Sequence, residues 1–164
     1  MLAYFGPSRK AVDLPYYDEV ARLARDNDML ILTCLLSPAT HHLIDAKVID
    51  ALGADSFLVN IARGPVVDER ALIAALASDK LAVAALNVFE HEPDVPEALM
   101  RDRRFVLAPH IGSGTEETRR ATAENVVDAL AKHFGIEGPR NPTAIRVELE
   151  RAGSNNRPLS IADY

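Results

Sequence analysis

The stretch FLVNIARGPVVDERALIAALASDKLAVAALNVF, residues 57–89, alternates between two kinds of hydrophobic pattern. Its first part, FLVNIA at 57–62, is a short continuous apolar run, which is typical of a strand buried on both faces of a sheet. Asp68 is a suitable cap for a helix that extends to about Ala77 with apolar residues on one stripe. A second apolar run follows at 81–89. The segment therefore predicts a strand, a helix and a second, parallel strand.

The same alternation extends to both sides of this segment. Further strands are expected at 1–5, 29–35 and 105–111, and further helices at 17–25, 45–52 and 115–134. Ser37 followed by Pro38 is typical of the start of one more helix. Regular alternation of this kind predicts an α/β fold, in which a doubly wound parallel sheet is covered by helices on both faces.

The composition is that of an ordinary soluble domain. The chain has 164 residues, with 18 Lys and Arg against 24 Asp and Glu, a formal net charge of -6 and one cysteine. The negative charge gives no reason to expect nucleic acid as a partner. Because Cys34 stands alone, a disulfide framework and a cysteine-rich zinc site are excluded within the chain. No apolar run is long enough for a membrane helix and no signal peptide is evident, so a cytoplasmic protein is expected.

The character of the sequence changes after Gly135, where a GPRNP break follows. Residues 143–164 are poor in apolar side chains, although 143–149 has the pattern of a strand. We therefore expect one domain over residues 1–135 and a C-terminal tail over residues 136–164.

Chemically useful side chains follow the expected strands, and ligands of parallel α/β sheets bind beyond the carboxyl ends of the strands. Arg63 comes directly after the strand at 57–62; it either forks onto a carboxylate or is a surface arginine in a tight turn. His110 lies at the end of the last apolar run, where it is well placed to give or take a proton. The alternative for His110 is a histidine that is hydrogen-bonded within the fold.

Another strand end carries an acidic loop, formed by Glu90, His91 and Glu92. A metal cluster is disfavoured, because the two glutamates straddle His91 and no second histidine is close in sequence. Either a single carboxylate projects toward a partner or the loop is merely solvated. His41 and His42 are weaker candidates, expected to be structural or exposed.

Gly112, Gly114 and the start of the long helix partly match the dinucleotide-binding pattern G-x-G-x-x-G. The third glycine is replaced by Glu117, and Glu116 and Glu117 would repel a pyrophosphate at the start of the helix. No other stretch matches the pattern, so the sequence contains no glycine turn of this kind.

Three of these segments together resemble the nicotinamide-dependent D-2-hydroxyacid dehydrogenase family. The run LVNIARGPVVDERALIAAL is similar to the family's arginine signature, LNVFEHEPDVPEAL to its glutamate signature and APHIGSGTEETRRA to its histidine signature. Their order and separation agree with the family, and the resemblance covers about residues 1–134. Within the family, the chain is most similar to the glyoxylate/hydroxypyruvate and hydroxyphenylpyruvate reductases.

The resemblance implies a role for each strand-end residue. Arg63 would hold the carboxylate and carbonyl oxygen of the substrate. His110 would donate a proton to that oxygen as hydride arrives at carbon, and Glu92 would hydrogen-bond His110 and fix its orientation. Ile61 and Gly112 would line the nicotinamide side of the cofactor.

The resemblance also indicates which cofactor is used. NAD-using members usually have an acidic residue at the end of the first strand, where it accepts from the ribose hydroxyls. This chain has Ser8, Arg9 and Lys10, a hydroxyl and two cations that suit a 2′-phosphate. NADP(H) is therefore favoured over NAD(H), the alternative being a solvent-facing basic turn.

Asn87 departs from the Asp that the family usually has near the nicotinamide amide, so one charge is lost there.

A larger departure is that the chain begins at what resembles the family's second Rossmann strand. The expected fold is therefore a Rossmann-like sheet without its first strand, its glycine-rich turn and the preceding substrate domain. Since the first strand normally lies centrally, two unpaired strand edges are expected. Three ways of filling the gap are open: a longer native protein, a strand exchanged in an oligomer, or the segment at 143–149.

The implied function is that of the cofactor-binding, catalytic part of a 2-oxoacid reductase, acting on a small 2-oxo or 2-hydroxy acid such as glyoxylate or hydroxypyruvate. Family members commonly pair through this domain, which implies a homodimer. The isolated chain is expected to be inactive or weakly active, because the phosphate-binding turn and a closing cleft are missing. The alternative is a non-catalytic remnant that acts as a dimerisation or interaction module.

Overall fold

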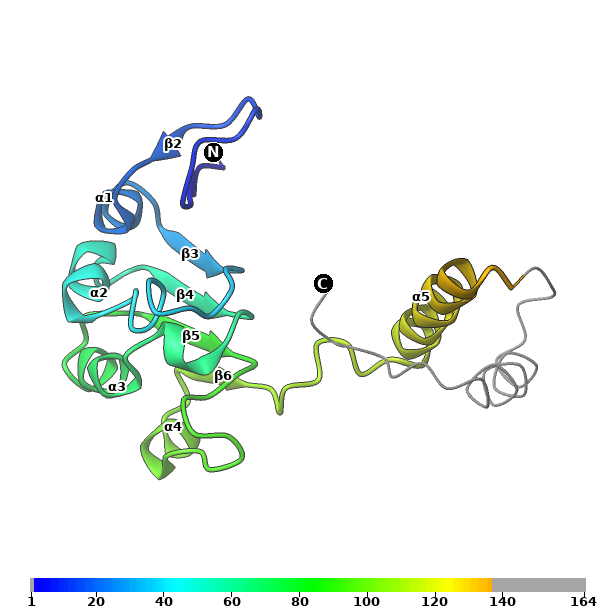
Figure 1. The fold of residues 1–164 in the computed structure, drawn as a ribbon. Coiled ribbons are helices and arrows are strands. Elements are labelled where there is room, and N and C mark those ends of the chain that lie inside the picture. Colours follow the sequence, from blue (N-terminus) through cyan, green and yellow to red (C-terminus); the bar gives the residue numbers. More distant parts are fainter. Residues whose placement is uncertain (1, 137–164) are drawn as a thin grey trace. The chain divides into compact units, whose positions relative to one another are not determined.

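The computed structural model describes residues 2–136. The chain divides into two compact units, one that ends at Gly112 and one that begins at Ser113. The first unit contains the strands, and the second contains one long helix (Figure 1). The strand expected at 143–149 lies outside the described residues, which reach only the first residue of the tail expected at 136–164.

Four parallel strands form the main sheet, in the order β3-β4-β5-β6. The strands are β3 (Met29–Leu32), β4 (Phe57–Asn60), β5 (Val83–Leu86) and β6 (Phe105–Leu107). Neighbouring strands are in register, with Leu30 opposite Leu58 and Leu58 opposite Ala84. The predicted parallel sheet is confirmed, and because its strands are parallel, their carboxyl ends meet at one edge.

A second parallel sheet has only two strands, β1 (Tyr4–Phe5) and β2 (Tyr16–Tyr17). The sequence did not predict β2, and the helix expected from residue 17 instead begins later, as α1 (Val20–Arg25). Within residues 2–136, no strand pairs with the other edge of β1 or with the free edge of β3. A groove of about 800 Å³, lined mainly by apolar side chains, lies between these two edges. This is the gap expected of a doubly wound sheet without its central strand.

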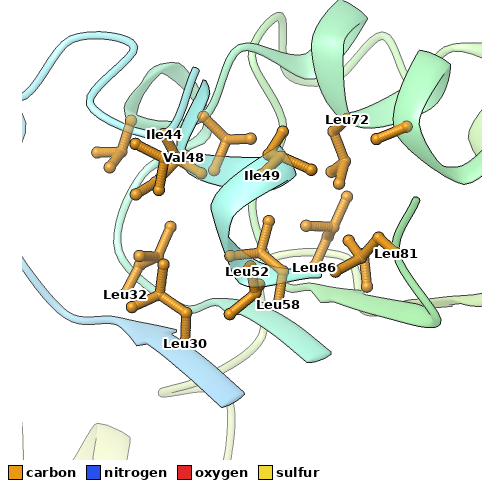
Figure 2. Packing of buried hydrophobic residues seen from close by; sticks show 14 of the residues in the cluster. Leu30, Leu32, Ile44, Val48, Ile49, Leu52, Leu58, Leu72, Leu81 and Leu86 are labelled. Carbon is orange, nitrogen blue, oxygen red and sulfur yellow. The ribbon is translucent and has the colours of Figure 1, made fainter. Parts of the chain in front are cut away.

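Three helices pack side by side over one face of the main sheet (Figure 1). They are α1, α2 (Ala46–Leu52) and α3 (Glu69–Ala77). In the core shown in Figure 2, Leu30, Leu58 and Leu86 from the strands lie close to Ile49 of α2 and Leu72 of α3. Connections between parallel strands are right-handed, and the four strands lie in the sheet in the same order as in the sequence. The helices that connect them therefore lie on the same face of the sheet.

The other face of the main sheet is exposed at β3 and exposed or half-buried at β4 and β5. Burial alternates along β3, where Leu30 and Leu32 are buried while Met29 and Ile31 are each 51% exposed. The prediction that the strands are buried on both faces is therefore wrong for this unit. The physical reason is that the connection between β1 and β2 contains no helix, so within residues 2–112 none covers the second face.

The helix ends follow local signals in the sequence. Asp68 accepts a hydrogen bond from a backbone N–H group in the first turn of α3, as predicted for a cap. Asp45, expected as the first residue of a helix, caps α2 in the same way. Thr115 does the same for the long helix α5 (Glu116–Phe134). The short helix α4 (Glu97–Arg101) was not predicted. Among the helices of the described residues, none is long and apolar enough to cross a membrane.

The helix expected from Ser37 and Pro38 does not form, and residues 38–42 make turns instead. Thr40 provides the reason, because its hydroxyl group accepts from Ser37 N at 2.8 Å and donates to Leu35 O at 2.6 Å. The side chain thus takes up backbone groups locally, in competition with a helix. The turn ends at His42, whose φ of 50° is in the left-handed region.

Candidate active site

A histidine and a carboxylate meet where β5 and β6 end. His110 Nδ1 lies 2.8 Å from Glu92 Oε2, and the two side chains are 46% and 35% exposed. His110 has a φ of 51°, and its backbone N–H donates to Ala108 O at 3.0 Å. When Nδ1 carries a proton it donates to the carboxylate, which leaves the opposite ring nitrogen, Nε2, to exchange a proton with a ligand. The structure therefore brings together two residues that the sequence placed on different strand ends.

Both carboxylate oxygens of Glu92 have partners. Oε1 accepts from Phe89 N at 2.9 Å, while Oε2 faces His110. The hydrogen bond with His110 lowers the pKa of Glu92 from its ordinary value, and burial opposes this by raising the pKa. The hydrogen bond from Phe89 N–H and the charges of His110 and Arg63 lower the pKa further. A carboxylate that stays ionised in this way can hold the imidazole ring in one orientation.

Arg63 follows β4 in a loop that Asn60 holds in place. Asn60 is 1% exposed; its Oδ1 accepts from Ala62 N at 3.0 Å and its Nδ2 donates to Arg63 O at 3.1 Å. The Arg63 guanidinium donates to Ala62 O at 2.7 Å and retains further N–H groups for a carboxylate. Asn60 was not predicted as a functional residue, although a polar residue inside an apolar strand was an available signal.

Asn87 links the end of β5 to the segment after β6. Its Oδ1 accepts from Ile111 N at 3.1 Å, and a Cβ atom on Gly112 would lie 3.3 Å from its Nδ2. An aspartate could accept the same hydrogen bond, so the asparagine keeps this link and removes one negative charge. Ile61, in the loop after β4, is 54% exposed. These three proposed cofactor-side residues, Ile61, Asn87 and Gly112, thus lie on the same strand ends as the charged ones.

The basic loop after β1 is exposed and is held locally. Lys10 Nζ donates to Ser8 Oγ at 3.2 Å, and Lys10 N donates to the Tyr4 hydroxyl at 2.7 Å. Arg9 is exposed. Within residues 2–136, no hydrogen bond or ion pair joins this loop to Arg63, Glu92 or His110, so the structure does not unite the two groups directly.

The acidic loop at 90–92 is not built as a metal centre. Glu90 Oε1 lies 2.8 Å from His42 Nε2, whereas Glu92 faces a different histidine, His110. Across the part of the chain that the structure describes, no group of three or more His, Cys, Asp or Glu side chains is arranged to hold a metal ion.

The lowered pKa of Glu92 predicts how the stability of the chain depends on pH. A carboxylate with a lower pKa in the folded state stabilises the fold above its pKa in the unfolded state, about 4.3. That stabilisation is lost as the pH falls from there through the lowered folded pKa. Because the Glu92 side chain is partly exposed, Glu92→Gln should reduce the free energy of unfolding at pH 7 by less than about 1 kcal/mol.

Urea unfolding of wild type and Glu92→Gln between about pH 3 and pH 7 checks this expectation. The difference between the two proteins should shrink as the pH is lowered. Glu19→Gln is the control, since Glu19 is exposed and makes no cap hydrogen bond with its side chain. A difference for Glu92→Gln that stays constant over the whole pH range would contradict the assigned cause.

Residues 2–112 match a known family, described as D-isomer specific 2-hydroxyacid dehydrogenase, NAD binding domain. Over 134 residues, the chain is 48% identical to hydroxyphenylpyruvate reductase of Plectranthus scutellarioides, which covers 81% of this chain and 43% of that protein. Over 119 residues, it is 52% identical to glyoxylate/hydroxypyruvate reductase A of Arabidopsis thaliana, covering 73% of this chain and 38% of that protein.

Solved structures share the fold. One is the NADPH-dependent glyoxylate/hydroxypyruvate reductase of Sinorhizobium meliloti in complex with NADP and malonate, with a TM-score of 0.77 at 37% identity. The match covers 82% of this chain and 42% of that one, so the chain spans less than half the length of these relatives. By sequence and by fold, the chain belongs to the D-isomer specific 2-hydroxyacid dehydrogenase family and carries an NAD(P)-binding domain of that family.

Proposed function

We propose that this chain supplies the catalytic side chains and part of the cofactor surface of a reductase that converts a small 2-oxo acid to a 2-hydroxy acid. The observation that carries the proposal is the contact between His110 and Glu92 at the strand ends, one strand away from the loop of Arg63. The names of its relatives, reductases of glyoxylate, hydroxypyruvate and hydroxyphenylpyruvate, support a 2-oxo acid as the substrate.

Each of the three side chains has one task in this reaction. Arg63 binds the substrate's carboxylate and carbonyl oxygen through the guanidinium N–H groups that the loop does not use. His110 donates a proton from Nε2 to the carbonyl oxygen, which becomes the hydroxyl group of the product. Glu92 accepts from Nδ1, so that the ring is oriented and its positive charge is stabilised.

The cofactor supplies the hydride when it is bound. Ile61, Asn87 and Gly112 would hold its nicotinamide end: Ile61 offers an exposed apolar side chain, and Gly112 has no side chain that would crowd a flat ring. The sequence has no G-x-G-x-x-G turn for the pyrophosphate. We therefore expect the isolated chain to bind cofactor weakly and to turn over slowly or not at all.

The test is a reductase hybrid, in which this chain replaces the matching segment of the Plectranthus reductase. The hybrid should reduce hydroxyphenylpyruvate or glyoxylate with NADPH. Titration calorimetry of the isolated chain with NADPH is the companion measurement. A non-catalytic interaction module would give no turnover in the hybrid and no heat of binding, and that pair of results would overturn the proposal.

NADPH is the proposed cofactor, in preference to NADH. Ser8, Arg9 and Lys10 form an exposed loop after β1, and its hydroxyl and two cations suit a phosphate on the ribose. The solved Sinorhizobium relative is named as NADPH-dependent, which supports the same choice.

In the reductase hybrid, Arg9→Ser should raise the KM for NADPH by about tenfold or more, since one charge-assisted hydrogen bond is worth about 1.5–3 kcal/mol. The KM for NADH should change by less than about twofold, because NADH has no 2′-phosphate for Arg9 to bind. Steady-state kinetics with both cofactors measures this. Arg103→Ser, at another exposed arginine, is the control. Equal changes for the two cofactors would show that Arg9 does not select between them.

Three further parts of the proposal concern the whole protein. Residues 1–135 form the cofactor domain and residues 136–164 a tail. The chain forms a homodimer in solution, and it works in the cytoplasm. The unpaired thiol of Cys34, in a chain with no second cysteine, suits a reducing compartment and supports the last of these.

A further inference from the structure

A second histidine–glutamate pair lies on the loop that carries Glu92. His42 Nε2 is 2.8 Å from Glu90 Oε1, and the side chains are 34% and 16% exposed. The two residues are 48 positions apart in the chain, so the pair joins the turn after β3 to the loop after β5. His42 reaches this position from a backbone with a φ of 50°. The proton-transfer mechanism proposed above has no use for this pair.

The backbone around His42 is also hydrogen-bonded to the loop that follows Arg63. His42 N donates to Pro65 O at 2.8 Å, and Ile44 N donates to Val66 O at 3.0 Å. Pro65 and Val66 belong to the short 3₁₀ helix η1 (Gly64–Val66), which begins directly after Arg63. His42 therefore contacts the arginine loop through its backbone and the Glu92 loop through its side chain.

Glu90 is held from a second side by Glu69, at the start of α3. Glu69 N donates to Glu90 Oε2 at 3.4 Å, and Glu90 N donates to Glu69 Oε2 at 3.2 Å. Glu69 is 7% exposed, and burial raises the pKa of its carboxyl group. The first half of the loop is thus braced by two side chains, and the link to His42 is the shorter of the two made by the Glu90 carboxylate.

The same loop then places the active-site carboxylate. Phe89 and Glu90 pack against the backbone of Gly64, and Phe89 N donates to Glu92 Oε1 at 2.9 Å. A displacement of residues 89 and 90 would therefore move the atom that holds Glu92. Because Gly64 follows Arg63 directly, the displacement would also change the position of Glu92 relative to the arginine.

We propose that His42 and Glu90 are positioning residues. Their contact, called the brace below, holds the loop at 89–92 in place, so that Glu92 contacts His110 and keeps its position relative to Arg63. The catalytic meaning of this brace rests on the proposed function, whereas its geometric effect on Glu92 does not. A pair that only stabilised the fold would change the free energy of unfolding and leave the contact between Glu92 and His110 intact.

The test follows the side-chain carboxyl signal of Glu92 by carbon-13 NMR as the pH is varied, using the full chain. His110→Asn sets the scale: without its histidine partner, the pKa of Glu92 should rise toward its ordinary value. His42→Asn should produce a large part of the same rise, and asparagine tolerates the left-handed backbone at both positions. In the His110→Asn background, His42→Asn should add no further rise, because the contact that it positions is already absent.

His41→Asn is the matched control, since the His41 ring lies 4.1 Å from the His42 ring but makes no hydrogen bond or ion pair with Glu90 in the described residues. It should leave the pKa of Glu92 unchanged. If His42→Asn fails to fold, Glu90→Gln replaces it, because the amide keeps the size of the side chain and loses the charge; it should raise the pKa of Glu92 in the same way. In the reductase hybrid, either variant should lower kcat by about tenfold and change KM by less than about twofold.

The two proposals fail in different ways. If His110→Asn leaves the pKa of Glu92 unchanged, the catalytic pair is not formed and the proposed function loses its support. If His110→Asn raises that pKa while His42→Asn and Glu90→Gln do not, the catalytic pair stands and the brace is overturned.

Discussion

Gly64→Ala is expected to destabilise the chain by about 3 kcal/mol or more, which is at the upper end for overpacking. A Cβ atom on Gly64 would lie 1.8 Å from Phe89 O, 2.0 Å from Phe89 C and 2.5 Å from Glu90 N. All three are backbone atoms, so no side chain can rotate to relieve the contact. The added methyl group can be accommodated only if the arginine loop and the glutamate loop move apart.

Urea unfolding followed by circular dichroism measures this loss. Gly6→Ala is the matched control, since a Cβ atom on Gly6 would meet no atom within 4 Å; it should change the free energy of unfolding by less than about 0.5 kcal/mol. A Gly64→Ala chain with the unfolding midpoint of the wild type would show that the two loops do not touch. The carboxyl signal of Glu92 provides a second readout, because Phe89 N donates to Glu92.

The sequence was sufficient where short-range chemistry determines the structure. Apolar runs predicted the four strands of the main sheet, and Asp68 predicted where α3 begins. Parallel strands then bring their carboxyl ends to one edge, which is why Glu92 and His110 could be expected to meet although 18 positions separate them. Their catalytic roles remain a proposal.

The sequence was insufficient where structure depends on neighbours far along the chain. β2 has two residues, too few for any hydrophobic period to be recognised. Continuous apolar runs predicted burial on both faces, but Ile31 and Val106 are 51% and 62% exposed because the helices of this unit lie on one face. An apolar run indicates that a strand suits burial, and it does not say what covers each face.

The supporting residues of the site were the hardest to predict. His42 was expected to be merely structural or exposed, and its link to Glu90 depends on a left-handed turn and on a partner 48 positions away. Asn60 acts through backbone groups of its own loop, which no spacing rule reveals. The residues that would touch a ligand follow from fold topology, whereas those that hold them depend on the detailed conformation of loops.

His110→Asn should lower kcat/KM of the reductase hybrid by about 10²- to 10⁴-fold, the usual contribution of a positioned general acid. The reason is that the amide of Asn does not release a proton near neutral pH. The variant also lacks the imidazole ring, whose Nδ1 lies 2.8 Å from Glu92 Oε2 in the wild type. Its short side chain tolerates the φ of 51°, so the backbone should be preserved. Steady-state kinetics gives the loss, and NADPH binding should change by less than about twofold, because the proton is used only in the chemical step.

His91→Asn is the control for this variant, since His91 is an exposed histidine next to Glu92 in sequence. It should retain activity within about twofold of the parent hybrid, as is usual for a surface substitution away from the reacting groups. Comparable losses in the two variants would assign the effect to disturbance of the loop at 89–92. Full activity in His110→Asn would mean that the proton comes from another group. The proposed role of Glu92, which is to orient His110, would then be lost as well.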